Sequence, residues 1–272
     1  MDDPGAIYAF FRIITELGSE TFFIVVIPPI YWCINKKIGY NLLVLSTLTA
    51  YITINLKNLT RFSRPSDRLA ISTYSTYTFP SGHAHGTTAF WLYLWLIFKK
   101  HWLIILGVLI ISLVSISRVY LRVHYCEDII VGIALGVLSV IAFNVFEPKL
   151  TKIVKQLDLN QKLSLALIIP LLLIAHSALI FQLDTQAVKL SSALLGIFIG
   201  GVLEQKYVNF STGTNLWSKL FRTFFGLFIA YLAYFGIAYI IPFNITTCIL
   251  TSFLGGFTVT FIAPWAFTKL GK

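Results

Sequence analysis

Long apolar stretches separated by short polar segments run through almost the whole chain. A transmembrane helix needs about 20 mostly apolar residues, and several stretches approach that length. They lie near residues 20–35, 38–56, 82–98, 102–117, 129–146, 163–181, 187–203, 221–241 and 245–267. This pattern predicts an all-α protein, a polytopic bundle of about nine transmembrane helices.

Two further segments have a helical pattern with a single apolar face. Residues 6–19 are apolar on one face but are interrupted by charge. In residues 149–162, Leu150 and Ile153 recur at helical spacing, and Lys152 lies away from them. The first pattern indicates an interfacial or half-inserted helix, and the second indicates a helix that lies on a membrane surface rather than crossing it.

The composition supports a membrane protein and suggests its orientation. Of the 272 residues, 57% are hydrophobic and 12% charged, whereas soluble domains carry about a quarter charged residues. The net charge of +10 does not indicate nucleic acid binding, because no basic stretch interleaves with stacking aromatic residues. Instead, 13 of the 21 Lys and Arg residues fall in loops on one side of the predicted bundle. Because cytoplasmic loops are enriched in these residues, we expect an extracytoplasmic N-terminus and a cytoplasmic C-terminus.

Three polar clusters fall at the ends of predicted spans, all on the face opposite the basic loops. Ionisable residues at membrane depth are functional candidates because they are costly to bury there. The first cluster contains Lys57, Arg61 and Arg64, followed by Pro65. If the preceding helix continues, spacings of four and three place the cations on one face. The cluster fits anion binding, or equally a basic helix end that reaches toward lipid phosphates.

The second cluster is Pro-Ser-Gly-His at residues 80–83, directly before an apolar run. A Ser-Gly step that opens a helix presents backbone N–H groups and the positive end of the helix dipole, which favours a bound anion. His83 would lie beside that anion. An ordinary helix N-cap is the alternative.

The third cluster, residues 117–128, contains Arg118, His124 and Asp128. A spacing of four lets the Asp128 carboxylate hold the His124 imidazole in one tautomer on a helix. A histidine oriented in this way beside an arginine is typical of an activated nucleophile or base. A capped loop with a surface salt bridge is the alternative, but three such clusters on one face favour a shared site.

Together these motifs resemble the type 2 phosphatidate phosphatase superfamily, which includes glucose-6-phosphatases, lipid diphosphate phosphatases and vanadium haloperoxidases. The family pattern is K-x6-R-P, then P-S-G-H, then S-R-x5-H-x3-D, and every fixed residue is present at matching spacing within residues 57–128. The expected nine spans and outside N-terminus are most similar to the glucose-6-phosphatase and lipid diphosphate phosphatase branches. His85 departs from the family, in which a small or apolar residue is usual at that position.

The resemblance implies an all-α phosphatase core and phosphate hydrolysis through a phosphohistidine, with no metal and no cofactor. It implies that His124 attacks phosphorus, that Asp128 orients the His124 ring, and that His83 protonates the leaving oxygen. The residues implied to surround the phosphoryl oxygens are Lys57, Arg64, Ser81, Gly82 and Arg118.

Two other functions stay open at this point. A metal-dependent membrane hydrolase would use as ligands His83, His85, His124 and Asp128, but it would leave the cations of the first cluster unexplained. A non-enzymatic carrier of lipid phosphate would need the anion site but not the nucleophile and acid. The scattered cysteines do not form a disulfide framework or a metal motif; they are Cys33, Cys126 and Cys248.

The membrane setting favours a lipid phosphate as substrate, such as a polyprenyl diphosphate or a phosphatidate, with a soluble sugar phosphate as the alternative. We expect the active site on the extracytoplasmic face. Residues 66–79 should cover the site, with Arg68, Tyr74 and Tyr77 as candidates to contact the leaving group. Membrane lipids are expected neighbours, and we infer no protein or nucleic acid partner.

The expected organisation has three parts. Residues 1–148 should contain the N-terminal interfacial helix and the catalytic helical core. Residues 149–162 should form an interfacial amphipathic linker, and residues 163–272 should form transmembrane helices without a recognisable motif.

Overall fold

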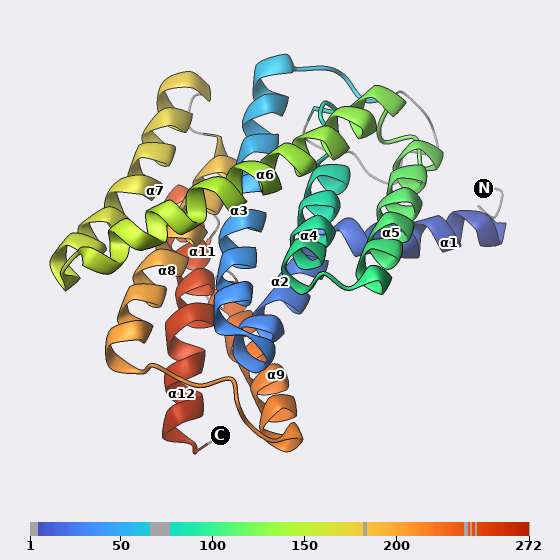
Figure 1. The fold of residues 1–272 in the computed structure, drawn as a ribbon. Helices are drawn as coiled ribbons and strands as arrows, with labels where there is room; N and C mark the ends of the chain where they lie inside the picture. Colours follow the sequence, from blue (N-terminus) through green and yellow to red (C-terminus); the bar gives the residue numbers. More distant parts are fainter. Residues whose placement is uncertain are drawn as a thin grey trace. The chain divides into compact units, whose positions relative to one another are not determined.

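The computed structural model describes residues 5–65, 77–181, 184–236, 239, 241–242 and 244–271, and these residues form helices and no strands (Figure 1). The predicted all-α fold is therefore confirmed. The elements, in chain order, are α1 (Gly5–Thr15), η1 (Glu16–Gly18), α2 (Glu20–Pro29), η2 (Ile30–Ile34), α3 (Lys36–Thr60), α4 (Gly82–Phe98), α5 (His101–Tyr120), α6 (Cys126–Gln156), α7 (Leu159–Phe181), α8 (Thr185–Tyr207), α9 (Leu216–Tyr231), η3 (Leu232–Gly236), α11 (Ile245–Phe257), η4 (Thr258–Ile262) and α12 (Ala263–Lys269).

Seven helices within the described residues are long and apolar enough to cross a membrane. They are Lys36–Thr60, His101–Tyr120, Cys126–Gln156, Leu159–Phe181, Thr185–Tyr207, Leu216–Gly236 and Ile245–Lys269. Residues 5–18 and 20–34 together would form an eighth span with a bend. The predicted span at 82–98 corresponds to α4, which has 17 residues and is shorter than the usual spanning length of about 20. The count of nine spans therefore stays a prediction.

The contacts divide the chain into two compact units. The first contains Met1–Ile24 and Ile52–Glu147, and the second contains Val25–Tyr51 and Pro148–Lys272. The predicted three-part organisation also stays a prediction. Residues 149–156 continue α6 without a break, and α7 begins at Leu159.

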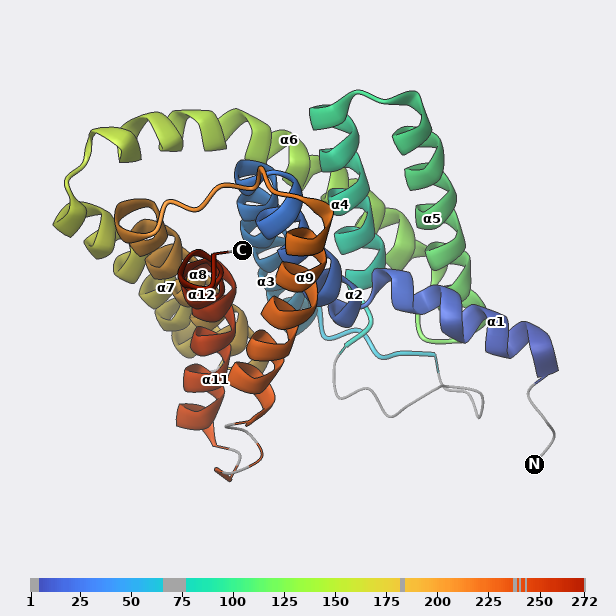
Figure 2. The same ribbon diagram turned by 90° about the horizontal axis from the view of Figure 1, so that it is seen from below.

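In the first unit, α4 and α5 form an antiparallel pair, and α1 packs against α5 (Figures 1 and 2). The tight turn between α4 and α5 uses Lys99 in the left-handed conformation, with φ of 50°, as the C-cap of α4. Gly107 of α5 faces Trp91 of α4, where an added Cβ would come within 3.0 Å of the Trp91 side chain. These features bring the beginning of α4 and the end of α5 to the same end of the pair.

The beginning of α6 packs closely against α4 through two glycines. A Cβ at Gly132 would lie 2.7 Å from the carbonyl oxygen of Ser81, and a Cβ at Gly136 would lie 2.6 Å from the Cβ of Thr88. Small residues one turn apart let two membrane helices approach closely. The pair therefore fixes the first turns of α4 and α6 next to each other.

In the second unit, α8 packs against α7 and α11. Its glycines permit a similar close approach, since a Cβ at Gly196 would lie 2.1 Å from the carbonyl oxygen of Phe253. Glu204 of α8 is fully buried and pairs with the Lys36 ammonium at 2.6 Å. It also accepts a hydrogen bond from the amide of Phe210. These partners offset the charge of a buried carboxylate that the sequence alone did not assign.

Candidate active site

The structure places all eight predicted site residues in the first unit, at helix ends or in the connections between helices. Lys57 lies in the last turn of α3, and Arg64 lies after its end. Ser81 precedes α4, which begins with Gly82 and His83. Arg118 lies in the last turn of α5, His124 lies just before α6, and Asp128 lies in the first turn of α6. Hydrogen bonds connect these segments, so motifs spread over residues 57–128 form one cluster.

His124 is held by a carboxylate and a hydroxyl. Its Nδ1 lies 3.1 Å from Asp128 Oδ2 and 3.1 Å from the Thr78 hydroxyl. The Thr78 hydroxyl donates to the same carboxylate oxygen, and the amide of Tyr125 donates to it at 2.9 Å. Because Asp128 accepts these bonds, we assign the His124 proton to Nδ1, which leaves the lone pair on Nε2. This is the arrangement that a nucleophilic imidazole requires.

The surroundings of His124 also favour its neutral form. Burial lowers the pKa of its imidazole from the ordinary value of 6.5 to about 3, although the hydrogen bond to Asp128 acts in the opposite direction. The positive charges of Lys57, Arg118 and Arg64 lower the pKa further. Three cations are therefore close enough to act on the ring, as a phosphate site requires.

Lys57 is buried and connects the end of α3 to the segment that carries Thr78. Its ammonium donates to the carbonyl oxygens of Tyr77 and Thr78, the second at 2.8 Å. An ammonium has three N–H donors. At most one of them can therefore contact a phosphoryl oxygen while these two bonds persist, but the charge still acts on the site.

Arg64 bridges two backbone segments. Its Nη1 donates to the carbonyl oxygen of Val123 at 2.8 Å, and its Nη2 donates to that of Tyr77 at 3.3 Å. The condition that would place all three cations on one helix face is not met, because α3 ends at Thr60 and Arg61 adopts a left-handed φ of 55°. Arg61 is exposed and donates to the carbonyl oxygen of Asn58, whereas Lys57 is buried.

The beginning of α4 has the form of an anion-binding turn. The Ser81 hydroxyl accepts from the Ala84 amide at 3.4 Å as an N-cap, and the Ser81 amide donates to the carbonyl oxygen of Asp128 at 3.0 Å. The helix itself supplies no partner for the amides of Gly82 and His83, because they belong to its first turn. A bound anion can accept from such amides.

His85 lies in the interior of the first unit. Its Nδ1 lies 2.7 Å from the Thr53 hydroxyl and its Nε2 lies 3.0 Å from the Ser139 hydroxyl. Both ring nitrogens are therefore used within the packing of α3, α4 and α6. Among the described residues, no group of three or more His, Cys, Asp or Glu side chains is placed to hold a metal ion.

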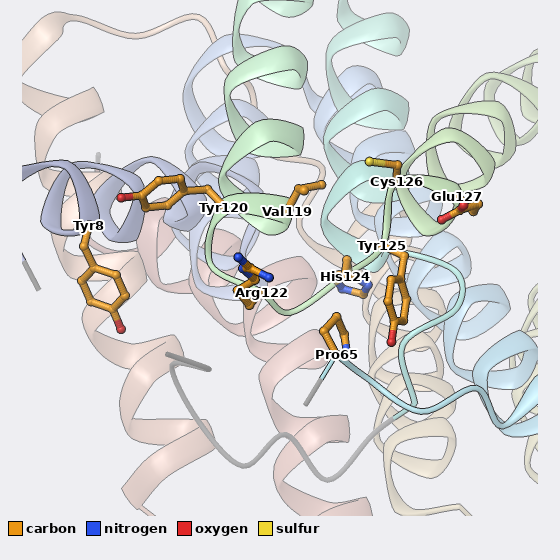
Figure 3. Close-up of a pocket in the computed structure, with 9 residues that line it drawn as sticks. All are labelled: Tyr8, Pro65, Val119, Tyr120, Arg122, His124, Tyr125, Cys126 and Glu127. Carbon is orange, nitrogen blue, oxygen red and sulfur yellow. The ribbon is translucent and has the colours of Figure 1, made fainter. Parts of the chain in front are cut away.

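A pocket of about 630 Å³ opens beside His124. Figure 3 shows the ring of Tyr125 close to His124 and Pro65, while Tyr8 and Tyr120 form a more distant wall. The remaining lining residues are Val119, Arg122, Cys126 and Glu127. The lining therefore combines apolar side chains with hydroxyl groups and charged groups. Of the candidate leaving-group contacts, Arg68 and Tyr74 lie outside the described residues, and the Tyr77 carbonyl accepts from Lys57 and Arg64.

Sequence reasoning missed Thr78, although it lies only two residues before the Pro-Ser-Gly-His motif. A hydroxyl residue in a polar segment carries no periodic signal, and its role depends on two residues about 50 positions away. Tyr8 was missed for the same reason, since α1 reaches the pocket only through the tertiary fold.

Comparisons with family models match two parts of the chain. Residues 39–152 match the model described as PAP2 superfamily, and residues 188–272 match the model described as PAP2 superfamily phosphatase, transmembrane extension. The first match contains all eight predicted site residues.

Three curated relatives are similar over part of the chain. Sphingosine-1-phosphate phosphatase 1 of Mus musculus is 31% identical over 50% of this chain and 34% of its own length. Decaprenylphosphoryl-5-phosphoribose phosphatase of Mycobacterium tuberculosis is 35% identical over 31% of this chain and 48% of its own length. Phosphatidylglycerophosphatase B of Bacillus subtilis is 33% identical over 51% of this chain and 74% of its own length. The chain thus spans about a third of the length of the sphingosine-1-phosphate phosphatases that it matches.

A solved structure is also similar. The crystal structure of the first transmembrane PAP2 type phosphatidylglycerolphosphate phosphatase from Bacillus subtilis aligns with a TM-score of 0.46 and 27% identity. The alignment covers 54% of this chain and 80% of that one.

Proposed function

Because this chain belongs to the PAP2 superfamily, we propose that it is an integral-membrane phosphatase that removes phosphate from a lipid phosphate. The observation that carries the proposal is the hydrogen-bonded group of His124, Asp128 and Thr78 with three cations acting on it. A binding protein would need the cations but not a neutral, oriented imidazole among them.

In the proposed first step, His124 Nε2 forms a bond to phosphorus as the bond from phosphorus to the leaving oxygen breaks. His83 gives a proton to that oxygen, so the lipid product leaves as an alcohol or a phosphate. Asp128 stabilises the positive charge that develops on the His124 ring. The product of this step is a phosphohistidine.

In the proposed second step, water attacks phosphorus and the bond to His124 Nε2 breaks. His83 takes a proton from the water as it attacks. Phosphoryl transfer depends mainly on positioning and on stabilisation of charge on the equatorial oxygens. We assign that stabilisation to Lys57, Arg64 and Arg118 together with the Ser81 hydroxyl and the Gly82 amide, with no metal ion or cofactor.

Two observations support a lipid phosphate over a soluble sugar phosphate. The names of the three relatives refer to lipid compounds: sphingosine 1-phosphate, a phosphatidylglycerophosphate, and a phosphoribose that is joined to a decaprenylphosphoryl group. The pocket beside His124 is walled by tyrosines, whose amphipathic rings suit the boundary between membrane and water. We further propose that this site faces the extracytoplasmic side.

The test measures phosphate release by the purified protein in detergent. The substrates are a polyprenyl diphosphate, a phosphatidate and glucose 6-phosphate. We expect faster release from the lipids, inhibition by orthovanadate, no effect of EDTA, and no release by the His124→Asn variant. Faster release from glucose 6-phosphate would indicate the sugar phosphatase. Inhibition by EDTA without inhibition by vanadate would indicate the metal-dependent hydrolase, and binding without release would indicate the carrier.

A rapid-quench experiment with ³²P-labelled lipid tests the intermediate directly. We expect acid-labile, base-stable label on the wild-type protein and none on His124→Asn. A variant that retains full turnover without His124 would exclude the phosphohistidine route.

A further inference from the structure

The N-terminal segment contacts one of the proposed phosphate-binding arginines. Arg118 Nη1 donates to the hydroxyl of Thr15, the last residue of α1, at 2.9 Å. Both side chains are buried, with exposed fractions of 1% for Arg118 and 5% for Thr15. A hydrogen bond to a charged group in a buried setting is stronger than one between neutral groups. This bond therefore fixes the guanidinium from a part of the chain 103 residues away.

The same segment also contacts the beginning of α4. A Cβ at Gly18, the last residue of η1, would lie 2.8 Å from the Thr87 hydroxyl oxygen and 2.8 Å from Val114 Cγ1. It would also lie 3.3 Å from Cδ2 of His83. A Cβ at this position would therefore clash with Thr87 and Val114, and it would also be in tight contact with the imidazole proposed to transfer the proton.

The N-terminal segment also reaches the pocket that opens beside His124, because Tyr8 of α1 lines this pocket (Figure 3). The opposite side of α1 is apolar and exposed, since Phe10 is 49% and Ile13 is 71% exposed and both lie about half a turn away from Tyr8 and Thr15. A helix of this kind lies at a membrane surface. The segment thus has one side at the proposed site and the other available to lipid.

We propose that residues 5–18 form a wall of the active site, in which Thr15 is a positioning residue for Arg118 and Gly18 leaves space for His83. The family match begins at residue 39, so it does not contain this wall. The inference rests on the proposed function, since it assigns Arg118 to the transferring phosphoryl group. Thr15 acts through Arg118 and does not itself contact phosphate.

A bond that orients Arg118 should matter more in the transition state than in the ground state. Charge on the equatorial oxygens changes during transfer, and a guanidinium already in place needs no rearrangement. Loss of the Thr15 hydroxyl should therefore lower kcat more than it raises KM. It should also weaken the binding of orthovanadate, which mimics the transferring group.

The experiment compares Thr15→Val, which keeps the shape and removes the hydroxyl, with Thr15→Ser, which keeps the hydroxyl. For Thr15→Val we expect a loss of kcat of about tenfold or more, the scale of one hydrogen bond to a charged group. We expect a comparable rise in the Kd of orthovanadate and a change in KM of less than about threefold. Thr15→Ser should restore kcat and vanadate affinity to within about threefold of the wild type, since its hydroxyl can accept the same bond.

The Gly18→Ala variant tests the contact with His83, with Gly107→Ala as its matched control. Gly107 also lies between α4 and α5, where its Cβ would meet Trp91, but it is not part of the proposed site. We expect Gly18→Ala to lower kcat by about tenfold or more, because general acid–base catalysis contributes about 10²- to 10⁴-fold and a displaced His83 would lose part of it. Gly107→Ala should change thermal stability without a comparable loss of kcat per folded molecule.

Equal kcat and equal vanadate affinity in Thr15→Val and the wild type would refute the proposal that Thr15 positions Arg118. The proposed phosphatase function would not be affected. A loss shared equally by Thr15→Val and Thr15→Ser would also refute the positioning role of Thr15, because the hydroxyl would then be irrelevant. If the wild-type chain released no phosphate, the proposed function would fail instead. The vanadate Kd of the two Thr15 variants would still decide whether the hydroxyl positions the anion-binding arginine.

Discussion

At the scale of single residues, Thr78 joins the two groups that the proposed chemistry depends on. Its hydroxyl lies 3.1 Å from His124 Nδ1 and donates to Asp128 Oδ2. Its carbonyl oxygen accepts from the Lys57 ammonium at 2.8 Å. One residue therefore orients the nucleophile and restrains a cation of the phosphate site.

We expect Thr78→Val to lower kcat by about 10- to 100-fold, because a hydrogen bond to a charged group contributes about 1.5–3 kcal/mol. Thr78→Ser keeps the hydroxyl and should recover most of the rate. Steady-state hydrolysis of a lipid phosphate by the two variants measures the difference. Equal rates for Thr78→Val and wild type would show that Asp128 orients His124 without help.

Arg64 should tolerate replacement by lysine poorly. Its guanidinium spans the carbonyl oxygens of Val123 and Tyr77, and a single ammonium cannot reproduce that fork. We expect Arg64→Lys to lower kcat by about 10²-fold, the scale of losing one preorganised donor, and to weaken vanadate binding. Unchanged kcat and vanadate affinity would show that Arg64 does not contact the phosphoryl group and only bridges the two backbone segments.

The lowered pKa of His124 has a consequence for pH dependence. The folded value is about 3 and the ordinary value is 6.5, so the unfolded chain binds the proton first as the pH falls. The contribution of His124 to stability should therefore be complete above pH 6.5 and decline between pH 6.5 and 3. In ¹⁵N-histidine-labelled protein, assigned with His124→Asn, the His124 nitrogens should remain those of a neutral ring at pH 5. A ring that titrates near pH 6.5 would contradict this expectation.

The motif residues could be predicted because their spacing in sequence carries the family pattern, and the family assignment is confirmed. Thr15 and Thr78 could not be predicted in this way. A hydroxyl residue is common at helix ends and in loops, and its partners are set by packing between distant segments. For Arg61 the spacing in sequence favoured a place in the anion-binding cluster. The structure instead ends the helix directly before this residue, which has a left-handed φ of 55°, and the Arg61 side chain bonds to the carbonyl oxygen of Asn58.

At the scale of elements, the glycines of α6 determine how closely the second and third motifs approach. We expect Gly132→Ala to destabilise the protein by about 1–3 kcal/mol, the range for overpacking, and to lower kcat. The reason is that its Cβ would lie 2.7 Å from the carbonyl oxygen of Ser81. Gly236→Ala is the control, because no atom lies within 4 Å of its Cβ. Thermal unfolding in detergent and kcat would both remain at wild-type values if α4 and α6 were loosely packed.

Helices were predictable as elements because apolar stretches of spanning length leave few alternatives in a membrane. Their ends were less predictable. The charged residues after 148 suggested a separate surface helix, yet α6 continues through Pro148 to Gln156. A proline removes one backbone donor but does not by itself end a helix when the next turns remain favourable.

At the scale of the whole molecule, the distribution of Lys and Arg predicts how the protein is oriented in the membrane. The helices alone do not determine this orientation. Cys126 is exposed at the pocket, whereas Cys33 and Cys248 are buried. In intact cells we expect an impermeant maleimide to label Cys126 from outside. A cysteine introduced at Gln156 in a Cys126→Ser background should stay unlabelled until the cells are opened. The reverse labelling would place the site on the cytoplasmic side.

The Ser81 amide donates to the carbonyl oxygen of Asp128 at 3.0 Å. Hydrogen exchange of this amide can therefore show whether the first turns of α4 and α6 are in contact. That amide proton can exchange with deuterium only when the first turns of α4 and α6 separate, because the bond joins two motifs rather than two turns of one helix. Its protection factor therefore measures how often the first turns of α4 and α6 separate in the protein without ligand. A substrate or inhibitor that grips both motifs should slow this exchange, even where the exchange of neighbouring helical amides does not change.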